Sequence, residues 1–258
     1  MKKYIDNFMQ YKFLLSQLVM KGIKLKYRRS VLGVFWSLLE PLLNMIVLTI
    51  VFGTLFGNNE KSFAVYVLTG RLLYSFFSQA TKASLKSIRS NAAMIRKVYV
   101  PKYLYPLSAT LHNYATFLPS LLVLFVVALI RGVYPTVYLL QIIYPLVLLL
   151  VLTYGIGMIL ATVGVFFRDI EYLWSVALTL IMYACAIFYY PEKIEASGFF
   201  WILKFNPVYA IINMFRSAVF GEWMNVWYVS YATIFSVAAL IIGLVVFKKN
   251  QDKFILSL

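Results

Sequence analysis

Residues 138–165 read YLLQIIYPLVLLLVLTYGIGMILATVGV and carry no charged side chain. A helix needs about 20 mainly apolar residues to cross a hydrocarbon core of ~30 Å, and this stretch exceeds that length. Five further stretches meet the same requirement, at approximately 34–57, 62–81, 104–130, 171–190 and 227–247. We therefore expect an all-α integral membrane protein with six transmembrane helices.

The composition of the whole chain agrees with a membrane protein. Hydrophobic residues make up 62% and charged residues 13% of the 258 residues, whereas soluble domains average roughly 45–50% and about 25%. A water-soluble fold has no means of burying that much apolar surface. The first long apolar run begins near Val34 and is too long for a signal core, so no cleaved signal peptide is expected.

Lysine and arginine are distributed unequally between the two sides of the predicted bundle. The segment 1–33 holds eight, 82–103 holds six, Arg168 adds one and the tail after Phe247 holds three, which makes 18 of the 24. The opposite side holds five, and Arg71 lies within a span. By the positive-inside rule the richer side is cytoplasmic, so both termini are expected inside. The net charge of +15 is thereby explained by membrane orientation, and no nucleic-acid partner is expected.

Two segments flank or interrupt the predicted spans. Residues 1–33 form an amphipathic interface helix ahead of the transmembrane domain, residues 34–258, with Phe13 as an exception to the pattern. Its apolar stripe comprises Tyr4, Phe8, Tyr11, Leu15, Leu18, Gly22 and Leu25. This helix suits either a membrane-surface anchor or a collar against a cytoplasmic partner. Between spans five and six, the apolar pieces 198–203 and 207–220 are too short to cross, so short re-entrant external helices are expected there.

The run KYRRSVLGVFWSLLEP at 26–41 resembles the opening of polysaccharide-exporter permeases. These are ABC-2 type transporter subunits for O-antigens, teichoic acids and capsular glycans. The resemblance continues at Tyr66 to Gly70, 95–101, 166–170 and Asn206-Pro207, in the family's order. It implies six spans in a bacterial cytoplasmic (inner) membrane and a homodimer whose channel is lined by the first and fifth spans. It also implies two copies of a separate ABC ATPase and a lipid-linked polysaccharide as the substrate.

The sequence lacks the parts of an enzyme. It has no Gly-x-x-x-x-Gly-Lys-Ser/Thr loop, so ATP and Mg²⁺ are expected on the partner ATPase and no cofactor in this chain. His112 and Cys185 are the only residues of their types, so no metal site is expected. No nucleophile motif accompanies His112, which is better explained as a hydrogen-bonding residue in helix packing.

The basic segment 82–101 precedes Pro101, which is expected to end a short helix. We predict that it docks the ATPase, although contact with anionic membrane lipids would explain the same charges. The predicted docking residues are Lys82, Lys86, Arg89, Arg96 and Lys97. A tight turn joins spans four and five and holds Arg168, Asp169 and Glu171. From the resemblance, these three form a cytoplasmic gate; the alternative is that they only solvate the turn.

Aromatic and charged residues within the spans are candidates for the substrate path. Tyr172, Tyr183 and Tyr190 fall at helical spacing on one face of the fifth span, where aromatic rings suit sliding sugars or simply pack. Arg71 lies near the centre of the second span, where arginine costs ~2.5–3.5 kcal/mol on insertion scales. We predict a structural ion pair with Glu40; the alternative is that Arg71 faces the channel and holds a carrier phosphate.

Three functions are compatible with these patterns. The first is the permease subunit of an ATP-driven exporter of lipid-linked polysaccharide. An ABC-2 permease for a small drug or lipid has the same general features. From another class, an ATP-independent membrane channel or scaffold also remains open.

Overall fold

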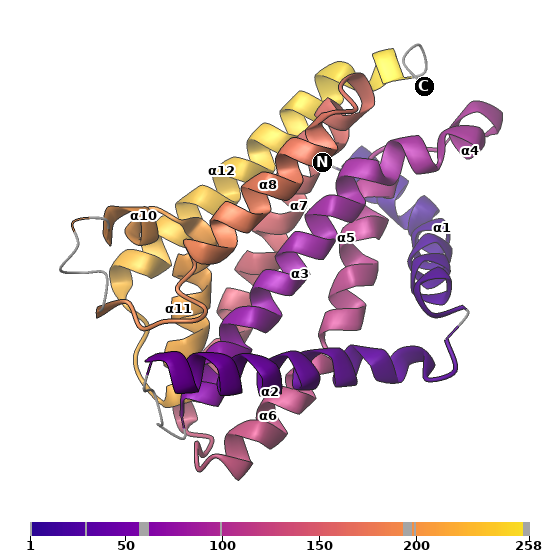
Figure 1. Cartoon of the computed structure of the whole chain (residues 1–258). Coiled ribbons are helices and arrows are strands. Elements are labelled where there is room, and N and C mark those ends of the chain that lie inside the picture. The colour runs from indigo at the N-terminus through magenta and orange to yellow at the C-terminus, as the bar shows by residue number, and fades with distance from the viewer. Residues whose placement is uncertain are drawn as a thin grey trace.

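The computed structural model describes residues 2–28, 30–56, 62–98, 100–192, 198 and 200–254, and every regular element in these ranges is a helix (Figure 1). The predicted all-α class is therefore confirmed. The helices are α1 (Lys2–Tyr27), α2 (Trp36–Phe56), α3 (Phe63–Ser90), α4 (Ala92–Lys97), α5 (Leu104–Phe117), α6 (Ser120–Ile130), α7 (Ile143–Phe166), α8 (Ile170–Tyr183), α10 (Phe200–Lys204), α11 (Pro207–Phe220) and α12 (Val226–Asn250). Short 3-10 turns span Gly33–Phe35, Val137–Ile142 and Gln251–Lys253.

Three regions are long and apolar enough to cross a membrane: Leu104–Ile130, Val137–Phe166 and Val226–Lys253. The apolar helices Trp36–Val47, Ile170–Tyr183 and Pro207–Phe220 are shorter. Helix α3 has 28 residues but includes Arg71 and several cations toward its end, which lower its apolar character. The chain is thus a multi-pass membrane protein, and six crossings remain a prediction.

Helix α7 packs between α3 and α12 and makes the most extensive contacts of the fold with both. Glycines permit a close approach of α7 and α12: a Cβ on Gly155 would lie 2.5 Å from the amide nitrogen of Leu240, and a Cβ on Gly243 would lie 2.4 Å from the Gly155 carbonyl oxygen. The clusters of polar and charged residues described below lie around this packed centre. In Figure 1, α4 and the C-terminal end of α12 lie at one end of the bundle, and α10 and α11 lie at the other.

The boundaries of three predicted elements differ from those observed. Helix α3 continues to Ser90 instead of ending near residue 81, and the short helix α4 ends at Lys97, before Pro101. The fifth predicted span, 171–190, is helical only to Tyr183, because the chain turns sharply through Ala186, whose φ is 46°. The segment between α8 and α12 contains the two expected short helices, α10 and α11.

Helix α1 packs against the bundle through the middle of its predicted apolar stripe, whereas Leu25 at the end of the stripe is exposed, and the side chains of Tyr4 and Phe8 lie outside the described residues. Leu15 and Leu18 are buried in a cluster that includes residues of α3, α5, α7 and Phe254 near the C-terminus. The contact with α5 is close, since a Cβ on Gly22 would lie 2.8 Å from the His112 ring. Phe13, the predicted exception, is exposed. The amphipathic helix therefore has a protein surface against it as well as an outward face.

Candidate functional site

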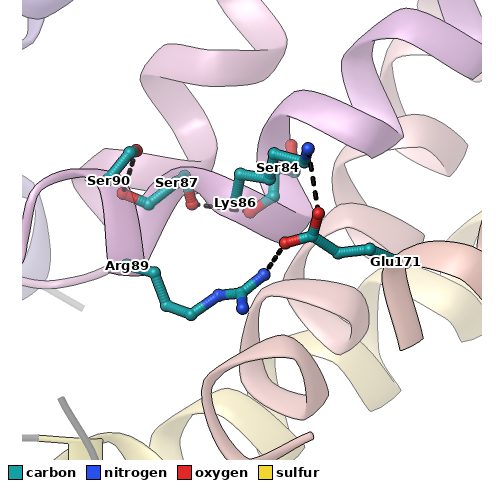
Figure 2. Close-up of polar contacts among 6 residues, drawn as sticks. All are labelled: Ser84, Lys86, Ser87, Arg89, Ser90 and Glu171. Carbon is teal, nitrogen blue, oxygen red and sulfur yellow. Dashed lines mark hydrogen bonds and ion pairs between the residues drawn. The ribbon is translucent and has the colours of Figure 1, made fainter. Parts of the chain in front are cut away.

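Three charged side chains join the end of α3 to the start of α8. Glu171 Oε2 accepts a charged hydrogen bond from Lys86 Nζ at 2.9 Å, and Glu171 Oε1 pairs with a guanidinium nitrogen of Arg89 (Figure 2). We call Lys86, Arg89 and Glu171 the α3–α8 clamp. The side chains of Arg89 and Glu171 are 22% and 27% exposed, so water screens their attraction only in part.

The clamp depends on the continuation of α3 to Ser90, past the end near residue 81 that the sequence predicted. Lys86 and Arg89 then lie three residues apart on one side of a continuous helix, facing the first turn of α8. A carboxylate in a first helical turn also interacts favourably with the helix dipole. The two serines next to the cations make hydrogen bonds within α3: Ser87 Oγ donates to the Ser84 carbonyl at 2.7 Å, and Ser90 Oγ donates to the Ser87 carbonyl at 3.3 Å (Figure 2).

The structure thus joins residues that the sequence placed in two separate groups. Two of the predicted docking cations contact the predicted gate residue Glu171 directly. Lys82 lines a hollow beside the clamp together with Tyr172 and Trp174. The remaining predicted residues lie exposed near this end: Arg96 and Lys97 on α4, and Arg168 and Asp169 in the turn before α8.

A polar cleft lies between α2, α3 and the α5–α6 region. Each of these elements contributes polar side chains at helical spacing, so three polar stripes face one another. The stripes comprise Ser37, Glu40 and Asn44 on α2; Arg71, Ser75 and Gln79 on α3; and Asn113, Thr116 and Ser120 on α5–α6. Lys26 at the end of α1 also lines this polar cleft and donates to Gln79 Oε1 at 3.0 Å. Figure 1 shows α2 running across the bundle.

The predicted ion pair between Glu40 and Arg71 is wrong in this structure. Both residues line the polar cleft, but the ion pairs among the described residues are those of the α3–α8 clamp. One Arg71 nitrogen lies 3.3 Å from Met182 Sδ, and the buried Arg71 Nε has no hydrogen-bond partner among the described residues. The Glu40 carboxylate acts on Lys26 instead: burial lowers the pKa of Lys26, and Glu40 opposes that shift.

The three predicted path tyrosines do not share one helical face. Tyr172 and Tyr183 lie on α8 and are 78% and 57% exposed. Tyr190 lies beyond the end of α8, where its ring packs 4.7 Å from that of Tyr66 and 5.8 Å from that of Phe63. The difference arises because residues after Tyr183 leave the helix, which ends the periodicity that the prediction used.

Arg216 was not among the residues predicted to have a role. It lies within α11, and its side chain is buried, with 4% exposed. Its position in an apolar helix was the available signal, since a cation there needs polar partners. Those partners come from residues far away in the chain, at Tyr66, Thr69 and Ala186. No local pattern identifies them.

The apolar helices, the polar cleft and the charged clamp together describe a multi-pass membrane protein with polar groups arranged inside its helical bundle. The chain belongs to the ABC-2 type transporter family, whose sequence model matches residues 14–220. Proteins of this family are transport permease subunits.

Relatives match along nearly the whole chain. The chain is 28% identical over 242 residues, 93% of each chain, to the O-antigen export system permease protein RfbA of Klebsiella pneumoniae. It is 29% identical over 223 residues to the protein of the same name in Myxococcus xanthus, covering 86% of this chain and 85% of that one. It is also 22% identical over 256 residues to the polysialic acid transport protein KpsM of Escherichia coli, covering 98% and 99%.

Proposed function

We propose that the chain is the permease subunit of an ATP-driven exporter that moves a lipid-linked polysaccharide across the bacterial cytoplasmic membrane. The observation that carries the proposal is similarity along nearly the whole chain to permeases named for O-antigen export and polysialic acid transport. These names favour a glycan over a small drug or lipid. Membership of an ABC transporter family disfavours an ATP-independent channel or scaffold.

Deletion of the gene tests this function directly. We expect surface polysaccharide to disappear while lipid-linked polysaccharide accumulates inside the cell, because synthesis continues without export. Restoring the gene on a plasmid returns the surface glycan. Unchanged surface glycan together with increased drug sensitivity would instead identify a drug exporter.

The proposed topology has six crossings, both termini in the cytoplasm and α10–α11 at the outer face. Support comes from the unequal distribution of lysine and arginine. The α3–α8 clamp, α4 and the end of α12 then lie together at the cytoplasmic face. This arrangement is consistent with Figure 1, where α4 and the end of α12 lie at the same end of the bundle.

The proposed exporter contains two copies of this chain and two copies of a separate ABC ATPase, which binds ATP and Mg²⁺. A second copy is compatible with the large apolar side chains that the single chain leaves exposed on several helices, among them α2, α6, α8 and α12, and the family resemblance favours α2 and α8 for the contact. On α2 these include Leu43, Val47 and Ile50, and on α8 they include Leu173, Val176 and Leu180. We propose that these faces of α2 and α8 line the channel between the two copies.

We propose that the ATPase docks on α4 and the end of α3. Arg96 and Lys97 are exposed on a short helix directly after the clamp residues, so they are free to contact an acidic surface. Reversing both charges, with Arg96→Glu and Lys97→Glu, is expected to reduce co-purification of the ATPase at least fivefold. Lys248→Glu with Lys249→Glu at the end of α12 is the matched control. Equal loss in both double variants, or no loss in either, would contradict docking on α4.

The proposed substrate path runs along the exposed face of α8, which carries Tyr172 and Tyr183, and includes Arg71 in the polar cleft. We leave Tyr190 out of the proposed substrate path because its ring packs against Tyr66 and Phe63. At the cytoplasmic end of the path, we propose that Glu171 links the gate to the docking surface, while the exposed Arg168 and Asp169 beside it solvate the turn. The clamp supplies the physical connection.

Tyr183 offers a test of the path. Its ring is exposed, and among the described contacts it makes an edge contact with the Phe188 ring at 6.3 Å between centroids. Sugar rings stack on an aromatic face without needing its hydroxyl. Tyr183→Ala is therefore expected to reduce export at least fivefold, and Tyr183→Phe is expected to retain most of it, measured as surface polysaccharide at equal protein level. Equal losses in both variants would assign the effect to the hydroxyl.

A further inference from the structure

The chain segment 184–190, which follows α8, is fixed to α3 and α11 through its backbone carbonyls. Asn206 Nδ2 donates to the Ala184 carbonyl at 2.9 Å. The Tyr66 hydroxyl lies 2.9 Å from the Ala186 carbonyl oxygen and 3.0 Å from that of Tyr189. Because these groups take the place of helical hydrogen bonds, the segment keeps one defined path after α8 ends.

Arg216 of α11 completes this attachment. Its Nη2 donates to the Ala186 carbonyl at 3.0 Å and to the Tyr66 carbonyl at 3.2 Å, and its Nε donates to Thr69 Oγ1 at 3.4 Å. The guanidinium carbon lies 3.5 Å from the centre of the Tyr66 ring. We call Arg216, Tyr66, Thr69 and Ala186 the Arg216 anchor. Gly70 provides the space, since a Cβ there would lie 2.7 Å from Arg216 Nη2.

Two features distinguish the Arg216 anchor from ordinary packing. The buried guanidinium forms no ion pair with a carboxylate among the described residues, and its Nη1 has no hydrogen-bond partner there. Ala186 adopts the left-handed region, with φ 46°, which is disfavoured for a residue with a side chain. The Arg216 guanidinium is held by carbonyl groups and an aromatic ring, and one of those carbonyls belongs to a residue in a strained conformation. Contacts of this kind are suited to breaking and forming again.

The Arg216 anchor and the α3–α8 clamp attach the same two helices at opposite ends. Tyr66 and Arg89 are 23 residues apart on α3, which corresponds to about 35 Å along a helix. The clamp holds the first turn of α8, and the anchor holds the segment that follows its last turn. A displacement of α8 against α3 that begins at the clamp therefore meets resistance at the anchor.

We propose that Arg216 and Tyr66 are positioning residues for the outer end of α8, and that segment 184–190 leaves the Arg216 anchor during each transport cycle. Cys185, the only cysteine of the chain, reports on this step without further substitution. Its side chain is completely buried and lies 3.4 Å from Asn206 Nδ2. A maleimide reaches the thiol only when the segment moves.

The first experiment measures N-ethylmaleimide labelling of Cys185 in membranes without nucleotide. Tyr66→Phe removes the hydroxyl that contacts two carbonyls, and Arg216→Met removes the donors but keeps bulk, so both are expected to raise the labelling rate at least tenfold. Tyr105→Phe is the control, because that buried hydroxyl has no hydrogen-bond partner in the part of the chain that the structure describes and lies on α5. Wild-type rates in Tyr66→Phe, or an equal rise in Tyr105→Phe, would overturn the proposal.

The second experiment rests on the proposed function and uses vesicles that contain the chain with its ATPase. Mg-ATP is expected to raise wild-type Cys185 labelling at least threefold, and to add little in Tyr66→Phe, where the segment is already released. Unchanged labelling while ATP is hydrolysed and glycan is exported would overturn release during the cycle and leave a static brace. An absence of ATP hydrolysis would count against the proposed function, and the first experiment would still decide whether the anchor holds the segment.

Discussion

Glu171→Gln is expected to reduce polysaccharide export at least tenfold while the amount of protein in the membrane stays unchanged. Glutamine keeps the size of the side chain but removes the charge that Lys86 and Arg89 share. Partly exposed ion pairs contribute little to stability, on the order of 1 kcal/mol or less, so folding should survive. Movement at the docking surface should no longer be passed on to α8, because the clamp is the charged link between α3 and α8. Surface glycan and membrane protein level are measured together.

Asp169→Asn is the matched control for this prediction. Asp169 lies two residues before Glu171 and is exposed, but it forms no ion pair in the part of the chain that the structure describes. It should therefore keep export near the wild-type level. Arg89→Glu with Glu171→Arg restores an opposite-charge pair and is expected to recover part of the lost export. Equal loss in Asp169→Asn and Glu171→Gln would show that general negative charge matters and the clamp does not.

Arg71→Leu is expected to leave protein yield unchanged and to reduce export at least tenfold. The sequence favoured a structural pair with Glu40, in which leucine at position 71 would strand a buried carboxylate. The structure places the two side chains in one polar cleft without pairing them, so removing the guanidinium strands nothing. What is lost is a fork of donors with one unsatisfied nitrogen, the geometry that suits a phosphate of a lipid carrier.

Two further variants separate the roles of Arg71. Arg131→Leu removes an exposed arginine after α6 and should not change export. Arg71→Leu combined with Glu40→Leu should express normally and still fail to export, because no ion pair needs to be rebalanced. A low yield of Arg71→Leu that the second substitution restores would establish the ion pair in place of a ligand-binding role.

The sequence predicted those parts of the fold that depend on local periodicity. The apolar stretches, the amphipathic α1 and the two short helices before α12 each carry their own pattern, and all appear as helices. The end of α8 was missed, because residues 184–190 are apolar and continue the pattern. Tyr66, Arg216 and Asn206 capture their carbonyls from distant parts of the chain, which outweighs the local preference.

The candidate site shows the same division. Lys86, Arg89 and Glu171 were recognised as functional candidates by charge and position, but their contact requires α3 to extend to Ser90, which charge counting does not predict. The Glu40–Arg71 prediction assumed that the first two spans lie side by side, so that the long arginine side chain reaches the carboxylate. Helix α2 instead crosses the bundle, and the two side chains line one cleft without forming a pair (Figure 1).

The most direct test of the account uses proteoliposomes that contain the purified chain with its partner ATPase and a fluorescent lipid-linked polysaccharide. A glycosidase added outside cleaves only glycan that has not been moved into the lumen. In vesicles whose exporter presents its ATPase to the outside, and so moves glycan into the lumen, Mg-ATP is predicted to make at least one third of the glycan resistant to cleavage. The chain without its ATPase should protect none. ATP hydrolysis that proceeds at a normal rate while the glycan stays fully cleavable would contradict the account.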